Sequence, residues 1–476
     1  MKFVNNLALG LFLACAGPSA AFAPATVASS TKQTSALFAD VSIGIFGGGT
    51  VGGGIVEILE KKKEYFEKMT GNTLNVKKIC VRDASKPRDF ELPEGCSVTT
   101  EYSDILEDDS IDMVVEVMGG TTQAKDVVYD ALKSGKNVVT ANKALIAAYM
   151  PEIEKLLADI NGKRETAVEF RYEAAVCGGI PIIRSLQSDF VGDDVQTVSG
   201  IINGCTNFML TAMDRDGKSY DEALSEASAL GYAEEDPTLD VGGFDARSKL
   251  KILMRLAYGV DVEEDDIPCS GITELTKLDF EYAKMMGGSI KLVGVASQVD
   301  NGDVSAFVSP CYVSADDSLF AVNGATNAVE LVSKNLVCTT LIGEGAGRYP
   351  TANSCINDIV ALAKGDKTPL PFNPASEDTK YEGDYSSDFY IRLKYKDCLG
   401  ITRQCGETCE KYGVSIHSIL QNPIKRKADA AFVLITEKVP VSKIKQVCAE
   451  MESLEWCNGP AFYMPVLGEN WATAMV

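Results

Sequence analysis

The apolar positions of residues 41–172 fall into short runs that are separated by amphipathic stretches. The runs at residues 41–46, 74–81, 111–117 and 137–140 predict buried strands, and the stretches between them predict helices. Strands and helices that alternate in this way indicate a parallel, doubly wound sheet. We therefore predict an α/β chain whose first part is a Rossmann-type dinucleotide-binding domain.

The hydrophobic pattern changes near the carboxyl end. Residues 366–385 are rich in Pro, Asp, Glu, Gly and Ser, which predicts a linker. Residues 386–476 then follow a βαββαβ order, which resembles the ACT domain, an amino-acid-binding regulatory module. Cys398 stands where that module usually has a proline in its first turn, whereas the glycine is kept as Gly400. The alternative is an appendage that only supports dimerisation or structure.

Residues 1–40 have the pattern of a targeting segment. Lys2 precedes an apolar run over residues 7–16, which is too short to span a membrane. Phe22 then opens a stretch with many Ser and Thr and no acidic residue before Asp40, as in a transit peptide. This order resembles the two-part plastid address of algae. We expect import into the plastid stroma, and secretion is the alternative.

Length and composition narrow the classes of function. With 476 residues, of which 46% are hydrophobic, the chain has room for about three domains. Its 45 Lys and Arg against 67 Asp and Glu give a net charge of −22, which argues against nucleic acid or an anionic membrane as a partner. His417 is the single histidine, so a multi-histidine metal site is excluded. We expect His417 to be a partly buried structural residue.

The cysteines indicate a reducing compartment. Of the 14 cysteines only Cys15 lies in the targeting segment, and the odd 13 that remain are scattered without a repeated spacing. This distribution does not suit a disulfide framework and agrees with a stromal location. Cys405 and Cys409 are four residues apart without a second pair, so we interpret them as ordinary thiols rather than metal ligands.

A glycine-rich turn follows the first predicted strand. Gly47, Gly49 and Gly52 form a G-x-G-x-x-G pattern, and the next helix begins around Thr50 and Val51. In such a turn the first glycine permits the tight bend, the second lets the backbone approach a pyrophosphate, and the third allows close helix packing. The amino end of the helix favours an anion. The order of strand, turn and helix predicts a dinucleotide site rather than a simple corner.

The residues after the second strand bear on the choice of cofactor. An acidic residue near this point usually binds the ribose 2′-hydroxyl, whereas cations accommodate a 2′-phosphate. Arg82, Lys86 and Arg88 favour NADP, and Asp83 leaves NAD open. The alternative interpretation of this basic cluster is a solvated loop.

Polar residues also follow the two later strands. Gly119, Gly120 and Thr121 come after one strand, and residues 140–143 come after the other. Ligands bind at the carboxyl edge of such sheets. We therefore expect Thr121 to contact the cofactor and Lys143 to contact the nicotinamide or the substrate. A salt-bridged surface lysine is the alternative for Lys143.

Residues 231–249 combine acidic residues with the start of a long helix. Asp245 and Lys249 are four residues apart, so on a helix they share one face and the carboxylate can orient the ammonium group. Glu234 and Asp240 crowd the same loop, which is costly unless cations or an ammonium substrate neutralise it. The alternative is an ordinary exposed ion pair with little effect.

With these residues in place, the sequence resembles the homoserine dehydrogenase family. Six motifs occur in the family's order and together cover about residues 41–365. They are residues 47–52, 140–143, 172–181, 200–207, 231–249 and 343–351. The resemblance implies an NADP-binding Rossmann domain over residues 41–172, to which residues 343–365 return. It also implies an α+β catalytic and dimerisation domain over residues 173–342.

The resemblance implies NADP(H)-dependent interconversion of L-aspartate 4-semialdehyde and L-homoserine, a step in threonine, methionine and isoleucine biosynthesis. By position, Lys249 matches the proton donor, Asp245 orients it, and Lys143 lies beside cofactor and substrate. Hydride delivery to an aldehyde builds negative charge on oxygen, and a lysine ammonium group both stabilises that charge and supplies the proton. The positions carried over for substrate binding are Gly231, Glu234 and Asp240.

The same resemblance assigns the remaining ligand sites. The cofactor-binding positions that it implies are Gly47, Gly49, Thr50, Val51, Gly52, Arg82, Thr121, Lys143 and Gly347. The positions that it implies for a monovalent cation, expected to be sodium, are Glu173 and the carbonyl groups of Val176, Gly178 and Ile180. Cys177 and Cys205 depart from the family, which more often has glycine and threonine there. Cys177 does not change the ligating carbonyl groups.

The sequence leaves two alternative functions open. A catalytically silent amino-acid sensor would keep the nucleotide and ACT folds, but Asp245, Lys249 and Glu234 argue against it. A different reductase on the same scaffold is the second rival. For a homoserine dehydrogenase we expect a small-molecule substrate, a homo-oligomer, and an end-product amino acid as effector, with threonine the first candidate.

Overall fold

The computed structural model describes residues 39–233, 235–368, 371–376, 378–423 and 430–468. The predicted targeting segment therefore lies almost entirely outside the described residues. In these described ranges, no helix combines the length and the apolar character that crossing a membrane requires.

In the described part of the chain, the first sheet contains six parallel strands in the order β3-β2-β1-β4-β5-β6. This order reverses between β1 and β4, which is the arrangement of a Rossmann-type sheet. The strand β5 has the predicted bounds, whereas β2 begins before residue 74 and β4 is shorter than residues 111–117. The strands are β1 (Ala39–Phe46), β2 (Asn72–Cys80), β3 (Ser97–Thr99), β4 (Met113–Glu116), β5 (Asn137–Thr140) and β6 (Phe170–Arg171).

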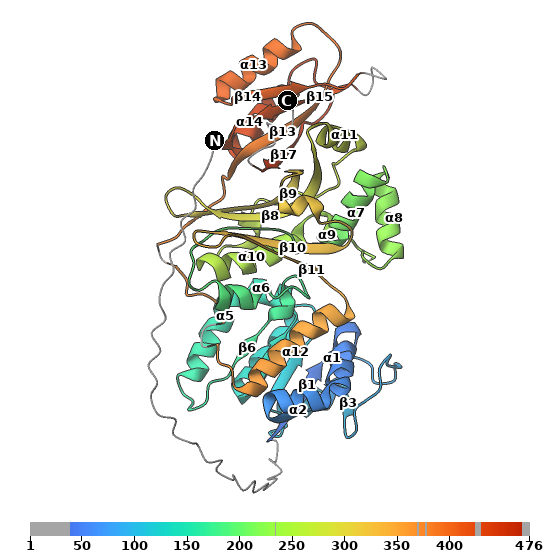
Figure 1. Ribbon diagram of the computed structural model, residues 1–476, viewed down its shortest axis with the longest axis vertical. Coiled ribbons are helices and arrows are strands. Elements are labelled where there is room, and N and C mark those ends of the chain that lie inside the picture. Colours follow the sequence, from blue (N-terminus) through green and yellow to red (C-terminus); the bar gives the residue numbers. More distant parts are fainter. Residues whose placement is uncertain (1–38, 234, 369–370, 377, 424–429, 469–476) are drawn as a thin grey trace, which may run out of the picture. The chain divides into compact units, whose positions relative to one another are not determined.

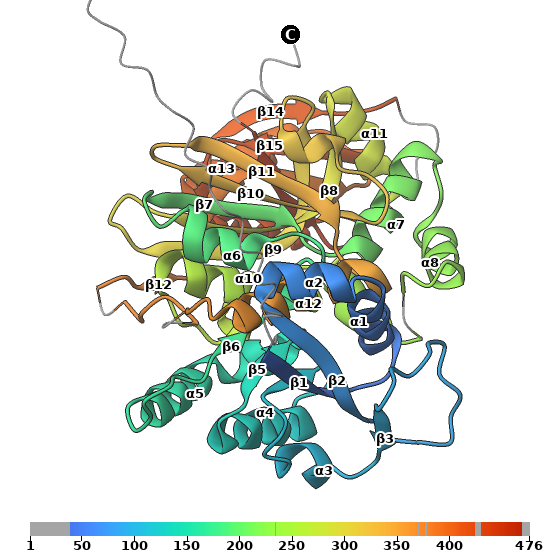
Figure 2. The same cartoon turned by 60° about the horizontal axis from the view of Figure 1, so that its bottom comes forward.

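Side chains of these strands alternate between two buried faces. Val114 and Val138 belong to the core under α3, α4 and α5, whereas Val115 and Val139 belong to the core under α1, α2 and α12 (Figure 2). Because helices cover both faces, consecutive residues of the central strands β4 and β5 are buried. The helices are α1 (Thr50–Lys61), α2 (Lys63–Thr70), α3 (Ser103–Leu106), α4 (Thr122–Ser134), α5 (Lys143–Asn161) and α12 (Arg348–Lys364).

Helix α12 comes from a distant part of the sequence and lies against α1 (Figure 1). A Cβ atom on Gly54 would lie 3.0 Å from the Arg348 carbonyl oxygen, so the two helices approach closely at this glycine. The Arg348 guanidinium group also forms ion pairs with Glu57 of α1 (3.0 Å) and with Asp89 (2.6 Å). The chain therefore returns to the first sheet after passing through the second.

Within the described residues, the second sheet has eleven strands, and its main path runs β11-β10-β7-β8-β9-β17-β13-β15-β14. The strands β12 and β16 pair beside this path with β9 and β13. Because β9 pairs with β17, the carboxyl-terminal part shares one sheet with the middle of the chain. The strands are β7 (Val195–Ile201), β8 (Gly288–Gln298), β9 (Val304–Ser314), β10 (Thr326–Ser333), β11 (Val337–Glu344), β12 (Tyr381–Glu382), β13 (Ser386–Lys394), β14 (Ile416–Leu420), β15 (Ala431–Thr436), β16 (Val439–Pro440) and β17 (Phe462–Leu467).

Helix α10 (Phe244–Tyr258) joins the two sheets. It contacts β7 and β8 of the second sheet and α5 of the first domain, where Arg255 pairs with Glu154 at 2.6 Å. The other helices that accompany the second sheet are α6 (Ile182–Arg184), α7 (Gly204–Arg215), α8 (Tyr220–Ala229), α9 (Thr238–Val241), α11 (Lys277–Met285), α13 (Ile401–Tyr412) and α14 (Val441–Glu452), with short 3₁₀ or π turns at Glu173–Ala175, Ser185–Asp189, Glu264–Asp266 and Ser318–Ala321.

The carboxyl-terminal elements follow the order β13, α13, β14, β15, α14 and β17, with the short β16 before α14. Cys405 and Cys409 are buried in the core beneath α13, where they pack as apolar side chains. The expectation for His417 is wrong, because its side chain is exposed on β14 and its Nδ1 lies 3.2 Å from the Ser418 hydroxyl. The strand β14 lies at the edge of the sheet, where an outward-facing residue meets solvent.

The segment predicted as a linker also contributes to packing. Phe372 is buried against the Tyr172 ring, with centroids 5.1 Å apart. Tyr385 stacks on Phe307 at 4.1 Å, and β12 pairs with β9. Composition alone predicts a spacer, but Phe372 packs against Tyr172 at the end of the first domain, and Tyr385 and β12 attach the segment to the second sheet.

Candidate active site

The glycine-rich turn joins β1 to α1. Gly47 has a φ of 114°, which favours glycine, and a Cβ atom there would lie 2.5 Å from the Val117 carbonyl oxygen. A Cβ atom on Gly52 would lie 1.9 Å from the Gly47 carbonyl oxygen. By contrast, apart from its chain neighbours, no described atom lies within 4 Å of a Cβ position on Gly49. The turn is therefore tight at its base and open at Gly49, beside the start of α1 at Thr50.

The three cations after β2 lie differently. Arg82 and Lys86 are exposed. Arg88 turns back, and its guanidinium group donates hydrogen bonds to the carbonyl oxygens of Asp83 and of Gly48, the latter at 3.5 Å. The Asp83 carboxylate is engaged within its own loop. The sequence did not distinguish among these cations, and the fold places Arg88 against the glycine-rich turn.

A buried carboxylate joins the carboxyl ends of β4 and β5. Glu116 accepts hydrogen bonds from the Thr140 hydroxyl (2.6 Å) and the Met118 backbone (2.9 Å), and burial raises its pKa. The Asn142 side chain donates to the Gly120 carbonyl oxygen at 2.7 Å and so links the two loops. Sequence reasoning missed Glu116, although an acidic residue at the end of an apolar strand was a visible signal.

Thr121 and Lys143 stand at the starts of the helices after these strands. Thr121 is half-buried and directly precedes α4. Lys143 begins α5, its side chain is 42% exposed, and its Nζ lies 2.7 Å from Oδ1 of Asp245 on α10. Lys143 is thus ion-paired, and its partner is one of the residues predicted to carry chemistry.

Asp245 and Lys249 lie one turn apart on α10, and both are buried. Nζ of Lys249 lies 2.8 Å from Oδ2 of Asp245 and donates a second hydrogen bond to the Ile202 carbonyl oxygen at 2.7 Å. Each carboxylate oxygen of Asp245 therefore faces one lysine. Because the pair is buried, the alternative of an ordinary exposed ion pair does not apply.

The electrostatics keep this pair charged. Burial by itself raises the pKa of Asp245, but the charges of Lys249 and Lys143 outweigh burial and hold that pKa well below its usual range. Burial likewise lowers the pKa of Lys249, but the neighbouring negative charges, Asp245 foremost, shift it upward overall. Lys249 therefore carries its proton at neutral pH.

Asn203 connects this pair to another carboxylate. Its Nδ2 donates to Oδ2 of Asp245 (2.8 Å) and to Oδ1 of Asp240 (2.7 Å), while its Oδ1 accepts from the Thr206 backbone and caps α7. Burial raises the pKa of Asp240. The sequence motif contained Asn203, but the bridge between two carboxylates follows only from the fold.

The other positions expected to bind substrate lie between α8 and α9. Gly231 is exposed and has a φ of 78°. Glu234 lies outside the described residues. The structure therefore brings Asp240 to the pair formed by Asp245 and Lys249, and it places Gly231 at the start of the same loop.

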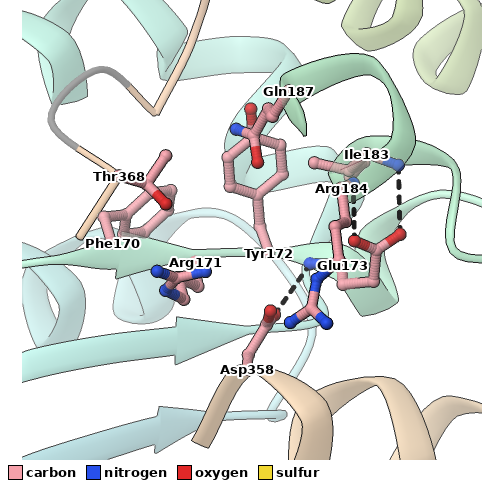
Figure 3. Close-up of a pocket in the computed structure, with 9 residues that line it drawn as sticks. All are labelled: Phe170, Arg171, Tyr172, Glu173, Ile183, Arg184, Gln187, Asp358 and Thr368. Carbon is pink, nitrogen blue, oxygen red and sulfur yellow. Dashed lines mark hydrogen bonds between the residues drawn. The ribbon is translucent and has the colours of Figure 1, made fainter. Parts of the chain in front are cut away.

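The segment expected to bind a cation follows β6. The buried Glu173 carboxylate accepts hydrogen bonds from the backbone of Ile183 (3.0 Å) and Arg184 (2.7 Å), and the Glu173 N–H donates to Asp358 of α12 at 2.9 Å (Figure 3). Burial, strengthened by the Asp358 charge, raises the pKa of Glu173 to about 7. Burial also raises the pKa of Asp358 to about 6. Sequence reasoning missed Asp358, which is far away in the chain.

Val176, Gly178 and Ile180 follow in a tight turn. The carbonyl oxygens of Gly178 and Ile180 each accept one hydrogen bond from the protein, at 2.6 and 2.8 Å. A carbonyl oxygen has two lone pairs, so each keeps capacity for a cation. Cys177 has a φ of 53°, in the left-handed region, which explains physically why glycine suits this position. In the described chain, this segment included, no three His, Cys, Asp or Glu side chains are grouped to hold a metal ion.

The segment before α12 lies against this turn. The Gly179 N–H donates to the Glu344 carbonyl oxygen at 3.0 Å, and a Cβ atom on Gly178 would lie 2.6 Å from the Gly345 carbonyl oxygen. Gly347 is exposed, has a φ of 119° and directly precedes α12. Residues 343–347 thus connect the second sheet to the turn after β6.

Comparison with known proteins agrees with this arrangement. The protein-family model described as "Homoserine dehydrogenase, NAD binding domain" matches residues 47–165, and the family model described as "Homoserine dehydrogenase" matches residues 181–360. The homoserine dehydrogenase of Bacillus subtilis is 35% identical over 438 residues, which cover 91% of this chain and 99% of that protein. The homoserine dehydrogenase of Synechocystis is 35% identical and covers 87% of this chain and 96% of its own length.

Solved structures lead to the same family. The homoserine dehydrogenase from Thiobacillus denitrificans superposes with a TM-score of 0.83 at 32% identity, covering 90% of this chain and 98% of its own. A hyperthermophilic archaeal homoserine dehydrogenase mutant in complex with NADPH has a TM-score of 0.57 at 29% identity. The match covers 70% of this chain and 99% of that chain. With this fold and near-full-length similarity, the chain is an NAD(P)-dependent oxidoreductase that acts on CH–OH groups and belongs to the homoserine dehydrogenase family.

Proposed function

We propose that this chain interconverts L-aspartate 4-semialdehyde and L-homoserine with NADP(H), and that Lys249 moves the proton. The observation that carries this proposal is the array in which the buried Asp245 binds the buried Lys249 through one carboxylate oxygen and the half-exposed Lys143 through the other. The array lies where α10 meets the carboxyl edge of the nucleotide-binding sheet. An aldehyde bound there would lie beside the positive charge of Lys143 and the ammonium proton of Lys249.

Lys249 has the geometry of a proton donor. An ammonium group has three N–H donors, and two of them are directed to Asp245 and the Ile202 carbonyl oxygen. The third is left for the substrate oxygen. In reduction, the aldehyde carbon gains a hydride and its oxygen gains the Lys249 proton, so the C=O double bond becomes CH–OH. Neutral Lys249 then regains a proton from solvent, and oxidation runs through the same steps in reverse.

Asp245 and Lys143 act as positioning groups in this scheme. The Asp245 carboxylate stabilises the ammonium form of Lys249. The Asn203 side chain donates a hydrogen bond to the same Oδ2 atom and so holds the carboxylate in place. Lys143 belongs to the nucleotide-binding domain, so its bond to Asp245 brings the two domains together at the site. The array thus combines charge with orientation, which are the two contributions that a carbonyl reduction requires.

The amino-acid end of homoserine is proposed to bind at the acidic loop after α8. Asp240 is held by Asn203, and its raised pKa marks a carboxylate that lacks full compensation in the protein alone. A substrate ammonium group would supply that compensation. The role proposed for Glu234 and the Gly231 backbone rests on their positions in the family motif.

The proposed cofactor is NADP(H), which supplies or accepts the hydride when bound. Gly49 and the free amino end of α1 would receive the pyrophosphate, together with Thr50 and Val51. Arg82 is exposed near that turn and would face a 2′-phosphate. Thr121 and Gly347 are proposed to contact the cofactor from the segments before α4 and α12.

We further propose a monovalent cation, sodium first, at Glu173 and the carbonyl groups of Val176, Gly178 and Ile180. The fit is supported by two buried carboxyl groups with raised pKa values, Glu173 and Asp358, in one place. A cation would offset the cost of burying their charge. Its role would be to fix the turn that contacts residues 343–347.

A homo-oligomer is proposed through the edge of the second sheet. The strand β11 pairs with β10 on one side, and it exposes Val337 (69%) and Ile342 (57%). Edge strands with exposed apolar side chains are sites of strand pairing and association. Ile342→Lys should therefore lower the oligomeric state measured by light scattering.

The carboxyl-terminal elements are proposed to form an ACT-type regulatory module that responds to threonine. Gly400 precedes α13 with a φ of 91°, and Cys398 is exposed beside it. Arg392 of β13 forms a buried ion pair with Asp279 of α11, and α11 packs against β8. A conformational change in the module would therefore be transmitted through this ion pair to α11 and β8. Titration with threonine, lysine, methionine and isoleucine tests this proposal, and a purely structural module would leave rate, affinity and assembly unchanged.

Residues 1–40 are proposed to direct the protein to a plastid stroma, in agreement with the free cysteines of the described chain. A fluorescent protein fused after this segment should enter the plastid of a suitable alga, and Phe22→Ala should divert it. Import of the Phe22→Ala fusion would remove the role given to Phe22, and secretion of the parent fusion would favour the alternative address.

The activity itself is tested by steady-state assays in both directions. Purified enzyme should oxidise L-homoserine with NADP⁺ and reduce L-aspartate 4-semialdehyde with NADPH, with kcat/KM well above that for other hydroxy amino acids. A higher kcat/KM for another hydroxy acid would point to a different reductase on this scaffold. Binding of cofactor and amino acids without any turnover would instead indicate a sensor.

A further inference from the structure

Three consecutive residues anchor the loop that follows β2. The Arg88 guanidinium group donates to the Gly48 carbonyl oxygen of the glycine-rich turn at 3.5 Å. The Asp89 carboxylate pairs with Arg348 at the start of α12. Phe90 is buried in the core that α1 and α12 share. The loop is therefore attached to three elements of the nucleotide-binding domain, one through each of these residues.

Arg348 is held in one orientation by the two carboxylates that it contacts. Its Nε and Nη2 atoms donate to the two carboxylate oxygens of Glu57 on α1, at 3.2 and 3.0 Å, and its Nη1 donates to Asp89 at 2.6 Å. All three nitrogens of the guanidinium group are thus engaged. An isolated ion pair at the surface contributes little, but a bidentate pair that belongs to a network of three charges is well ordered. Arg348 therefore links the loop to α1 and α12 at a fixed place.

Two glycines inside α1 make room for this guanidinium group. A Cβ atom on Gly53 would lie 2.6 Å from Nη2 of Arg348, and one on Gly54 would lie 2.9 Å from Cγ of the same side chain. The Cβ position of Gly53 is also only 2.7 Å from the Phe90 ring. Glycine inside a helix is destabilising relative to alanine, and the dinucleotide-binding pattern, which ends at Gly52, does not require these two. The close approach of Arg348 and of the loop accounts for them.

The anchored loop carries the cations that are proposed to face the 2′-phosphate. Arg82 and Lys86 precede the anchor and are exposed. A loop that is already held presents such side chains at a lower cost in entropy than a loop that must be ordered when the cofactor binds. A cofactor without a 2′-phosphate gains nothing from this arrangement.

We propose that Arg348 is a positioning residue that sets the preference for NADPH over NADH, because it holds the cationic loop in place through Asp89. Arg348 acts through the loop and needs no contact of its own with the cofactor. This inference rests on the proposed NADP(H) function and adds a specificity-determining residue to it.

The test compares the Kd values for NADPH and NADH, measured on the full chain without substrate. Arg348→Met keeps the stem of the side chain over α1 and removes the guanidinium group, whereas Asp89→Asn removes only the charge of its loop partner. In both variants the Kd for NADPH should rise about fivefold, while the Kd for NADH stays within about twofold. Adenosine 2′,5′-bisphosphate, which lacks the nicotinamide, should weaken as NADPH does. The double variant should match Arg348→Met, because both changes break the same ion pair.

Two further measurements separate this role from a purely structural one. Without cofactor, hydrogen exchange measured by mass spectrometry should be faster over residues 82–94 in Arg348→Met and in Asp89→Asn than in the parent. Lys125→Met is the matched control, since Lys125 of α4 pairs with Glu152 of α5 at 2.7 Å in the same domain and is about as exposed as the pair under test. This control should leave both the exchange of residues 82–94 and the ratio of the two Kd values unchanged.

The outcomes distinguish this inference from the proposed function. If Arg348→Met kept the parent's ratio of Kd values, or if it raised both Kd values equally, the inference would be wrong. A parent with equal Kd values for NADPH and NADH would overturn the NADP(H) preference together with this inference. If the parent preferred NADPH, lost that preference in Arg348→Met and did not turn over homoserine, the proposed function would fail while the role of Arg348 stood.

Discussion

Replacing Lys249 with methionine tests the array of Asp245 and its two lysines most directly, because methionine keeps the apolar stem and removes only the ammonium group. The lysine is assigned both the proton and the positive charge that the reacting oxygen needs. Loss of a general acid costs about 10²- to 10⁴-fold in rate, and loss of one electrostatic donor costs about 10²- to 10³-fold. One group supplies both, so the terms do not simply add. We expect kcat to fall by about 10³-fold or more in both directions.

The structure also sets the effect on stability. In Lys249→Met, the Asp245 carboxylate keeps Lys143 on one oxygen and Asn203 on the other. Complete loss of a partner in a buried ion pair costs about 3–5 kcal/mol, and the two remaining partners should hold the loss to about 1–2 kcal/mol. Asp245→Ala leaves the buried Lys249 ammonium group without its carboxylate, so its loss should reach about 3 kcal/mol or more.

The assay combines turnover, NADPH binding by fluorescence and thermal unfolding. Lys251→Met is the matched control, since Lys251 is a buried lysine on the same helix and has no place in the array. The Kd for NADPH should agree within about threefold among the parent, Lys249→Met and Lys251→Met. Turnover of Lys249→Met within a few-fold of the parent, in a folded protein that binds NADPH, would refute the assignment of the proton donor.

Three other predictions follow from the same contacts. The pKa of Lys249 is shifted upward, so the neutral amine that accepts a proton during homoserine oxidation becomes more populated as pH rises. The rate of homoserine oxidation should therefore increase between about pH 7 and pH 10. A rate that is independent of pH over this range would contradict the prediction. Arg82→Glu and Arg88→Glu should lower the ratio of kcat/KM for NADPH over NADH, the second more strongly because Arg88 contacts the glycine-rich turn; unchanged ratios would indicate a solvated loop. Truncation after residue 375 removes Arg392 from the buried Asp279 and β17 from β9, so the unfolding temperature should fall; an unchanged melting curve would show that the carboxyl-terminal part is energetically independent.

The sequence by itself determined the features that depend on near neighbours in the chain. Apolar runs separated by amphipathic stretches gave the strands and helices of the first sheet, because burial on two faces leaves a periodicity that is legible over a few residues. The tight bend at Gly47 and the pairing of Asp245 with Lys249 are also local. A backbone angle and a spacing of one helical turn are properties of short segments, so they could be predicted before any fold was known.

Only the tertiary structure decided which distant residues complete the site. Lys143 reaches Asp245 across the two domains, Asp358 joins Glu173, and Arg348 pairs with Asp89, although each of these residues looks ordinary in its own segment. The exposure of His417 and the packing of the predicted linker were decided in the same way. The free energy of a buried charge or amide depends on what surrounds it in space, and chain neighbours carry no record of that surrounding.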